Sequence, residues 1–97
     1  MNRKMIDPLT ILEESHMLSI LDFLADNEPC TKTTIYAAIS RSTRMPDKLD
    51  MLADAGLIEM MSVTKGRSVI RLTSKGRAVS EYIRDIRRMI ITETTSQ

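Results

Sequence analysis

The chain has 97 residues, of which 42% are hydrophobic and 28% are charged, with three glycines, three prolines and one cysteine. This length fits a single domain, and the composition excludes a disordered or fibrous protein. The lone cysteine excludes an intramolecular disulfide, no apolar run is long enough to span a membrane, and no apolar signal segment follows the first residues. These features predict a cytoplasmic globular protein.

Charge is distributed unevenly along the chain, although the net formal charge is only +1. Residues 1–40 contain three Lys or Arg against six Asp or Glu, whereas residues 41–88 contain eleven against six. A weak overall charge can therefore hide a basic face, and a clustered basic face is the electrostatic feature of nucleic-acid binding. Charge alone does not distinguish such a face from an ordinary solvated surface.

The first predicted element is a helix over residues 8–27. Asp7 and Pro8 fit an N-cap followed by proline at the first helical position. The apolar residues that follow recur at helical spacing and form one stripe, and Pro29 prevents simple continuation of the helix. The stripe consists of Leu12, Met17, Ile20, Leu21 and Leu24. This helix is expected to supply core contacts.

Two shorter helices joined by a turn are predicted over residues 31–56. Thr31 is a suitable N-cap for the first of them. The polar stretch 40–42 predicts a tight turn, and Ser42 or Thr43 can cap the second helix, because Pro46 fits only its first turn. Gly56 is suited to end this helix in a left-handed conformation. Two short helices in this arrangement are a helix-turn-helix.

After Gly56 the pattern changes from helical to strand-like. Residues 57–63 and 68–72 are rich in β-branched and apolar side chains, and the intervening residues 64–67 contain Gly66, which together predict a hairpin over 57–72. A last helix is predicted over residues 74–92, capped by Thr73 or Ser74. Residues 93–97 are expected to form a frayed tail.

Two motifs resemble those of a known superfamily. The first is LDMLADAGLI at residues 49–58, and the second is IRLTSKG at residues 70–76. They resemble the L-x-x-L-x-x-x-G-L-I and L-T-x-K-G patterns of winged helix-turn-helix proteins, especially small bacterial and archaeal MarR/ArsR/PadR-like transcriptional regulators. The resemblance covers roughly residues 17–88. It implies a mainly α fold with a small β-hairpin wing (α-α-α-β-β-α) and sequence-specific binding of double-stranded DNA by a transcriptional regulator.

In such a protein the helix expected over residues 43–55 enters the major groove. Leu49, Leu52 and Ala53 are expected to form its buried stripe, which leaves the polar residues near its start for DNA. Arg44 can bond a guanine with two hydrogen bonds, and Lys48 can reach guanine or phosphate. Asp47 and Asp50 fit less well because they repel phosphate, although Asp47 can favour the helix N-terminus or accept from a cytosine amino group.

The wing tip at residues 64–67 is basic and can lie along the DNA backbone or reach the minor groove. An ordinary solvated turn is the alternative. The residues expected to contact DNA are Thr31, Lys32, Arg41, Ser42, Thr43, Arg44, Asp47, Lys48, Lys65, Arg67 and Arg71.

The two terminal helices are expected to form a homodimer interface, as they do in many relatives of this kind. Two-fold pairing would place the recognition helices about 34 Å apart, on successive major grooves. The alternative is that the same side chains complete a monomer core. The expected interface residues are Met5, Ile6, Leu9, Tyr82, Ile86, Met89 and Ile90.

The sequence does not predict an enzyme. His16 is the only histidine, Cys30 has no histidine beside it, and this pair cannot form a structural zinc site by itself. No phosphate-binding glycine loop or dinucleotide fingerprint is present. No metal and no cofactor are expected, and the sequence does not indicate an effector.

Two other functions fit the same fold. One is a winged-helix module for protein contacts, since fold does not fix function; Asp47, Asp50 and Met51 leave it open, whereas the basic residues favour DNA. The other is a sequence-tolerant, chromatin-type DNA-binding protein. The near-neutral charge argues against it, because non-specific binding rests on phosphate neutralisation.

Overall fold

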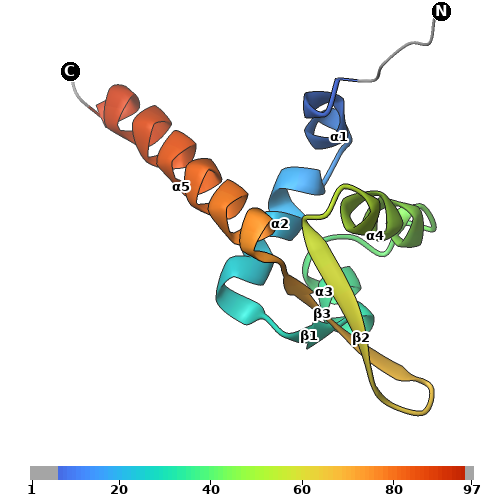
Figure 1. Ribbon diagram of the computed structural model, residues 1–97. Helices are drawn as coiled ribbons and strands as arrows, with labels where there is room; N and C mark the ends of the chain where they lie inside the picture. Colours follow the sequence, from blue (N-terminus) through green and yellow to red (C-terminus); the bar gives the residue numbers. More distant parts are fainter. Residues whose placement is uncertain (1–6, 96–97) are drawn as a thin grey trace, which may run out of the picture.

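The computed structural model describes the backbone of residues 7–95 and the side chains of residues 7–91. The β2–β3 hairpin and the far end of α5 project from opposite sides of the body of the molecule (Figure 1). The predicted order of three helical regions, hairpin and C-terminal helix is confirmed. The elements are α1 (Leu9–Glu13), α2 (Met17–Asn27), β1 (Cys30–Thr31), α3 (Lys32–Ala38), α4 (Met45–Asp54), β2 (Ile58–Thr64), β3 (Arg67–Leu72) and α5 (Ser74–Thr95).

An aliphatic core lies where α2 meets α3, α4 and the sheet. Helix α2 supplies the residues at its predicted stripe, with Met17, Ile20, Leu21 and Leu24 fully buried. Burial of each such side chain stabilises the fold by about 1.5–3 kcal/mol. The other helices and the strands contribute Ile35, Met45, Leu49, Leu52, Leu57, Ile58, Ile70, Leu72 and Ile83.

The single helix predicted over residues 8–27 is wrong, because it is broken into α1 and α2. Helix α1 begins at Leu9 with Pro8 as its N-cap, one residue later than the predicted Asp7 cap, although the Leu9 amide donates to Asp7 Oδ1 at 3.0 Å. The break falls at residues 14–16, where His16 has a left-handed φ of 73°. A non-glycine residue rarely adopts this conformation, and no glycine or proline marks the break in the sequence.

Helix α4 ends as the sequence predicts. Gly56 has a φ of 81°, and its amide donates to Ala53 O at 2.9 Å while the Leu57 amide donates to Leu52 O at 3.0 Å. These two bonds form a Schellman motif, which satisfies carbonyls at the helix end. The chain then turns directly into β2.

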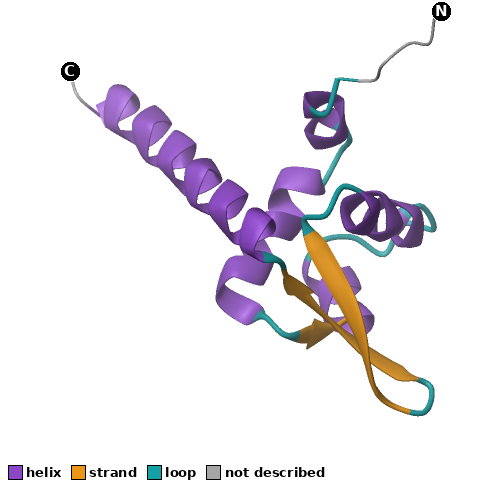
Figure 2. Cartoon of the chain, in the orientation of Figure 1, coloured by secondary structure: helices purple, strands orange, loops and turns teal. Residues whose placement is uncertain are grey.

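The hairpin belongs to a three-stranded antiparallel sheet with the order β1-β3-β2 (Figure 2). Strands β2 and β3 pair from Ile58 with Leu72 at the base to Thr64 with Arg67 at the tip. Gly66, with a φ of 76°, provides the positive φ that the tight turn requires. Strand β1, whose two residues pair with Ile70 and Val69, was not predicted from the sequence.

Helix α5 begins where the Thr73 hydroxyl accepts from the Gly76 amide at 2.9 Å, which confirms Thr73 as its cap. It runs to Thr95, three residues beyond the predicted end, so the frayed tail predicted from residue 93 is wrong for residues 93–95. Residues 96 and 97 lie outside the described residues. Among the described helices, none has the length and apolarity needed to cross a membrane.

Candidate nucleic-acid interface

The helix-turn-helix consists of α3, a connection over residues 39–44, and α4. Thr31 caps α3 as predicted, with its Oγ1 accepting from the Thr34 amide at 3.2 Å. The connection is longer than the predicted turn at 40–42, and α4 begins at Met45 rather than residue 43. Its N-cap is Arg44, not Ser42 or Thr43, although the Ser42 hydroxyl accepts from the Arg44 amide at 3.1 Å. These bonds fix the polar connection in place at the start of α4.

The basic side chains fall into two groups according to their partners. Six of those described form ion pairs with carboxylates within 4 Å: Lys48, Arg71, Arg77, Arg84, Arg87 and Arg88. Lys75 donates instead to the Ala55 carbonyl. The remaining five have no carboxylate within that distance among residues 7–91, and they are Lys32, Arg41, Arg44, Lys65 and Arg67.

These five unpaired cations all lie on the helix-turn-helix or on the wing tip. Lys32 starts α3, Arg41 and Arg44 lie in the connection to α4, and Lys65 and Arg67 flank Gly66. All except the half-buried Lys32 are exposed. Among residues 7–91, positive charge without an internal carboxylate partner is therefore confined to the helix-turn-helix and the wing tip, where it is available to an anionic partner.

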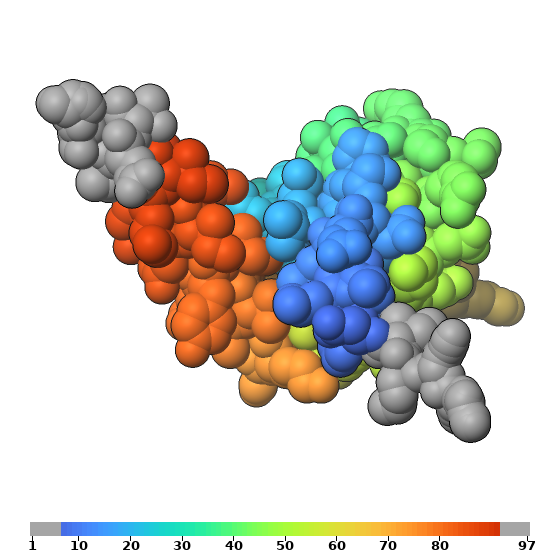
Figure 3. Space-filling view, turned by 90° about the horizontal axis from the view of Figure 1, so that it is seen from above, coloured from blue at the N-terminus to red at the C-terminus, as the bar shows by residue number. Residues whose placement is uncertain are grey.

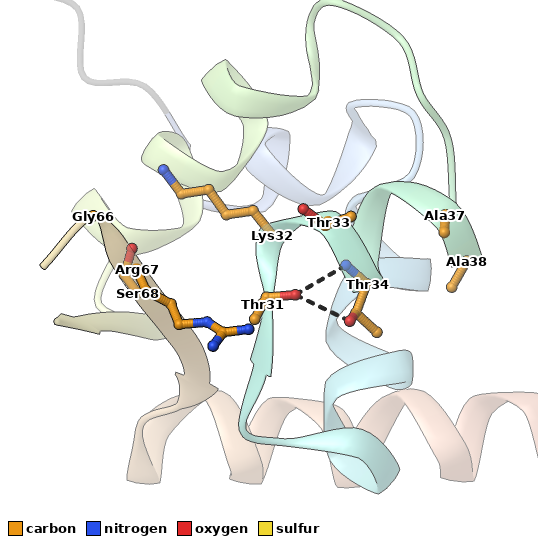
Figure 4. A pocket seen from close by; sticks show the side chains of 9 residues that line it. All are labelled: Thr31, Lys32, Thr33, Thr34, Ala37, Ala38, Gly66, Arg67 and Ser68. Carbon is orange, nitrogen blue, oxygen red and sulfur yellow. Dashed lines mark hydrogen bonds between the residues drawn. The ribbon is translucent and has the colours of Figure 1, made fainter. Parts of the chain in front are cut away.

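An open groove of about 940 Å³ separates the start of α3 from the wing. Arg67 extends from the wing toward Thr31, and Lys32 extends from the start of α3 (Figure 4). No acidic residue lines this groove, whose walls are Thr31, Lys32, Thr33, Thr34, Ala37, Ala38, Gly66, Arg67 and Ser68. Hydroxyl groups and cations in this combination suit phosphate oxygens. Thr33, Thr34 and Ser68 were not predicted, because only the folded hairpin brings Ser68 opposite Thr33 and Thr34 of α3.

The exposed side of α4 is acidic from its first turn onward. Asp47, Asp50 and Asp54 are all exposed. Burial raises the pKa of Tyr36 on α3, and the negative charge of Asp50 adds to the rise. Within α4 and the connection before it, only the N-terminal part, including Ser42, Thr43 and Arg44, thus combines exposure with a charge that suits DNA.

Lys48 does not lie on this surface, contrary to the prediction. It is only 7% exposed, because positions 45, 48, 49 and 52 share the buried face of α4. Its Nζ donates to Ser15 Oγ at 3.3 Å and lies 3.6 Å from Glu14 Oε1. The three- and four-residue spacing from Met45 and Leu52 was the available signal for this inward orientation.

Arg71 is exposed, but it is already paired. Its Nε lies 2.6 Å from Glu59 Oε2 on the neighbouring strand, in the half of the hairpin nearer the body. Contact with DNA would compete with this pair. Arg71 is therefore a weaker candidate than the unpaired cations at the wing tip.

A second surface, away from the helix-turn-helix, is apolar. On α5, Tyr82, Ile86 and Met89 are 69%, 55% and 67% exposed, and Ile90 and Ile91 are also exposed. The C-terminal part of α5 stands apart from the helix-turn-helix (Figure 3). A groove of about 310 Å³ runs between α5 and Leu18 and Ser19 of α2.

Five of the seven residues expected at a dimer interface are exposed apolar side chains in the structure. Leu9 is exposed on α1, and Tyr82, Ile86, Met89 and Ile90 lie along α5. Met5 and Ile6 lie outside the described residues. The exposed α5 side chains do not complete a monomer core, which was the alternative role considered for them.

The residues considered for chemistry are not brought together. His16 is exposed at the break between α1 and α2, and Cys30 is half-buried in β1. Burial raises the pKa of the Cys30 thiol, and Glu28 raises it further, so the reactive thiolate is disfavoured. Within the described part of the chain, no group of three His, Cys, Asp or Glu side chains could hold a metal ion.

No family model and no curated protein sequence matches the chain. Solved structures do match. A possible HxlR family transcriptional factor from Thermoplasma volcanium has a TM-score of 0.77 and 23% identity, over 92% of this chain and 86% of its own. A MarR family regulator from Porphyromonas gingivalis has a TM-score of 0.73 and 24% identity, over 92% and 97%.

A third match is a mutant of the Staphylococcus aureus regulator MepR bound to an oligodeoxyribonucleotide. Its TM-score is 0.74 and its identity is 22%, over 93% of this chain and 70% of the MepR chain. Each of the three matches covers more than nine-tenths of this chain. The chain therefore has the winged helix-turn-helix fold.

Proposed function

We propose that this protein binds double-stranded DNA in a sequence-specific manner and regulates transcription. The observation that carries this proposal is the position of the five unpaired cations, all of which lie on α3, the connection to α4 or the wing tip. Elsewhere in the described chain, basic side chains are held by carboxylates or, for Lys75, by a carbonyl. The solved structure of the MepR mutant, which has this fold, is bound to an oligodeoxyribonucleotide, which supports the same use of the surface here.

The start of α4 is the part of this surface suited to reading bases. Arg44 at the N-cap can bond guanine O6 and N7 together, and Asp47 one turn later can accept from a cytosine amino group. The acidic residues further along, Asp50 and Asp54, favour insertion of only the first turn. The wing tip and the groove beside α3 then hold the sugar-phosphate backbone through Lys65, Arg67 and Lys32.

We propose that the working form is a homodimer joined through α5. Tyr82, Ile86 and Met89 recur at four- and three-residue steps, so they form one stripe on the helix. Monomeric proteins rarely expose large contiguous apolar surface without a partner. A two-fold pair would present two recognition helices to two half-sites about 34 Å apart.

The test measures binding to labelled duplexes by fluorescence anisotropy across a salt series, with selection from a randomised duplex pool. Wild type should bind with an affinity that falls steeply as salt rises. Arg44→Ala should weaken binding by about 1–3 kcal/mol and relax one position of the selected sequence. The double variant Lys65→Ala/Arg67→Ala should weaken binding to all sequences. It should also reduce the slope of log K against log salt concentration by about 2, because two phosphate contacts are lost.

Arg88→Ala is the matched control, because it removes one exposed cation that is already paired with Asp85 on α5. It should leave affinity and salt dependence unchanged. If folded wild type shows no binding at low salt, the DNA proposal is wrong, and the acidic face of α4 would favour a module for protein contacts. If binding occurs without any selected sequence, a chromatin-type role is favoured instead.

A further inference from the structure

Lys48 occupies an unusual position for a lysine, on the buried face of the candidate recognition helix. It lies one turn after Met45 and one turn before Leu52, both fully buried, and it is itself only 7% exposed. Removing an ammonium group from water is costly unless hydrogen bonds and opposite charge compensate. An apolar side chain would fill this position without that cost. Packing alone therefore does not explain a charged side chain at this position.

The ammonium group connects α4 to the break between α1 and α2. Its Nζ donates to Ser15 Oγ at 3.3 Å and lies 3.6 Å from Glu14 Oε1. Both partners immediately precede His16, whose left-handed φ of 73° creates the break. Among residues 7–91, no other hydrogen bond or ion pair joins α4 to α1, α2 or the residues between them.

The connection reaches the surface proposed to read DNA. A hollow of about 290 Å³ is lined by Lys48 and its two partners, by His16, and by Ser42 and Arg44 from the start of α4. Arg44 is one helical turn before Lys48. Helix α1 has no buried residue, so apolar packing holds it less firmly than it holds α2. A movement of α1 or of the break can therefore be transmitted to the start of α4 through Lys48.

We propose that Lys48 is a positioning residue for DNA recognition. Its ammonium group fixes the start of α4 against residues 14–16 and does not itself contact DNA. This inference rests on the proposed function, because a positioning effect on recognition requires that α4 reads DNA. It also assigns Glu14 and Ser15, outside the helix-turn-helix, a role in setting the affinity for DNA.

The test compares Lys48→Met with Lys65→Met in the full chain, using anisotropy across a salt series. Each substitution removes an ammonium group and retains an apolar stem. Lys48→Met should lower affinity about three- to tenfold, in the lower part of the range for coupled groups in one network. The slope of log K against log salt concentration should stay equal to that of wild type. Lys65→Met should reduce the slope of log K against log salt concentration by about 1, as loss of a phosphate contact does. Thermal unfolding should show Lys48→Met folded at the assay temperature.

Glu14→Gln and Ser15→Ala provide independent evidence for the connection. Each should weaken DNA binding in the wild-type background and have little further effect in Lys48→Met, since the connection is already lost. A role in stability alone would change the unfolding temperature and leave affinity and sequence preference unchanged. That result would overturn the inference, as would a Lys48→Met salt dependence as shallow as that of Lys65→Met.

Failure of the proposed function has a different signature. If wild type and every variant lack DNA binding, amide resonances in two-dimensional NMR still test the connection. Glu14→Gln should then shift the amides of Ser42 and Arg44 as well as those of its sequence neighbours. Shifts confined to residues near Glu14 would show that the start of α4 is positioned independently of the break.

Discussion

Gly76 lies where the first turn of α5 passes very close to the backbone that enters β2. A Cβ atom at this position would lie 1.9 Å from Leu57 O and 2.9 Å from Leu57 C. The same Leu57 carbonyl accepts from the Thr73 amide at 3.1 Å, so it cannot withdraw without breaking that bond. The glycine of the L-T-x-K-G pattern thus has a steric explanation in this chain, which the sequence alone did not provide.

Gly76→Ala should therefore destabilise the protein, although alanine usually favours a helix over glycine by about 1 kcal/mol. Forcing a methyl group against a backbone carbonyl should lower the free energy of unfolding by about 1–3 kcal/mol. For a domain of this size, each kcal/mol lowers Tm by roughly 4–8 °C. Thermal unfolding followed by circular dichroism measures the change. Gly66→Ala is the control, because its Cβ would meet no atom within 4 Å and would incur only the left-handed φ cost of about 1 kcal/mol. Equal stability of Gly76→Ala and wild type would contradict the steric argument.

At the scale of elements, the contact between α2 and α5 combines packing with a network of ion pairs. Arg87 donates to both oxygens of Asp22, at 2.8 and 3.3 Å. Arg84 lies 3.4 Å from Asp22 and 2.6 Å from Asp26. The hydrogen bond from Arg87 holds the pKa of the Asp22 carboxyl below its usual 3.8, and the charge of Arg87 and the contact with Arg84 add to this effect, against the opposing effect of burial.

The stability of this contact should depend on pH. Because the pKa of Asp22 is lowered in the folded state, its contribution is present above the unfolded pKa and is lost as pH falls through the lower folded value. Asp22→Asn should lower Tm by several degrees at pH 7, and the difference from wild type should shrink below about pH 4. Thermal melts from pH 7 to pH 3 test this expectation. The control is Asp85→Asn, which breaks only the exposed pair with Arg88 and should have little effect on Tm at pH 7. If the Tm of Asp22→Asn stays below that of wild type by the same amount down to pH 3, the mechanism is excluded.

The features that the sequence predicted correctly are those with local causes. Pro46 and Gly56 bracket α4 because the first fits only an early helical position and the second adopts a positive φ. Gly66 likewise provides the wing turn. The order of the winged helix follows from these residues and from the apolar spacing between them. The same locality explains why α2 and its buried stripe could be predicted.

The features that the sequence did not reveal depend on tertiary structure. β1 has only two residues, and Cys30 becomes a strand residue only because Ile70 lies opposite. Nothing local marks the left-handed His16 that divides the first helix. The prediction that Lys48 faces DNA was wrong because residue type was given more weight than its position on the buried face. Most of the candidate surface was predictable from charge and motif, whereas the groove required the folded hairpin.

At the scale of the whole molecule, the two distinctive surfaces lie on different parts of the chain. The unpaired cations belong to the helix-turn-helix and the wing, and the exposed apolar stripe belongs to α5, which projects away from the wing (Figure 1). A partner on α5 therefore leaves the cationic surface open. Two-fold pairing through α5 would join two of the cationic surfaces proposed to bind DNA without covering either of them, which is the arrangement that a two-half-site duplex requires.

Breaking that stripe should separate assembly from folding. Ile86→Asp/Met89→Asp places two charges on side chains that are more than half exposed, so the isolated chain should keep its helical content and its Tm should not fall through loss of core packing. In a homodimer the same charges would be buried at the interface, and sedimentation equilibrium should show a shift from dimer to monomer. Arg88→Ala, on the same helix but outside the stripe, should remain dimeric.

The consequence for DNA binding follows from linkage between half-sites. A dimer that engages two half-sites gains about 10²- to 10⁴-fold over one domain, because the second contact is intramolecular. The Ile86→Asp/Met89→Asp variant should lose this gain on a duplex with two half-sites and bind a single half-site as wild type does, measured by anisotropy with both duplexes. If the variant is monomeric and still matches wild type on the two-site duplex, the recognition helices act singly. If wild type itself is monomeric at the assay concentration, α5 does not pair two copies, and its apolar stripe serves another partner.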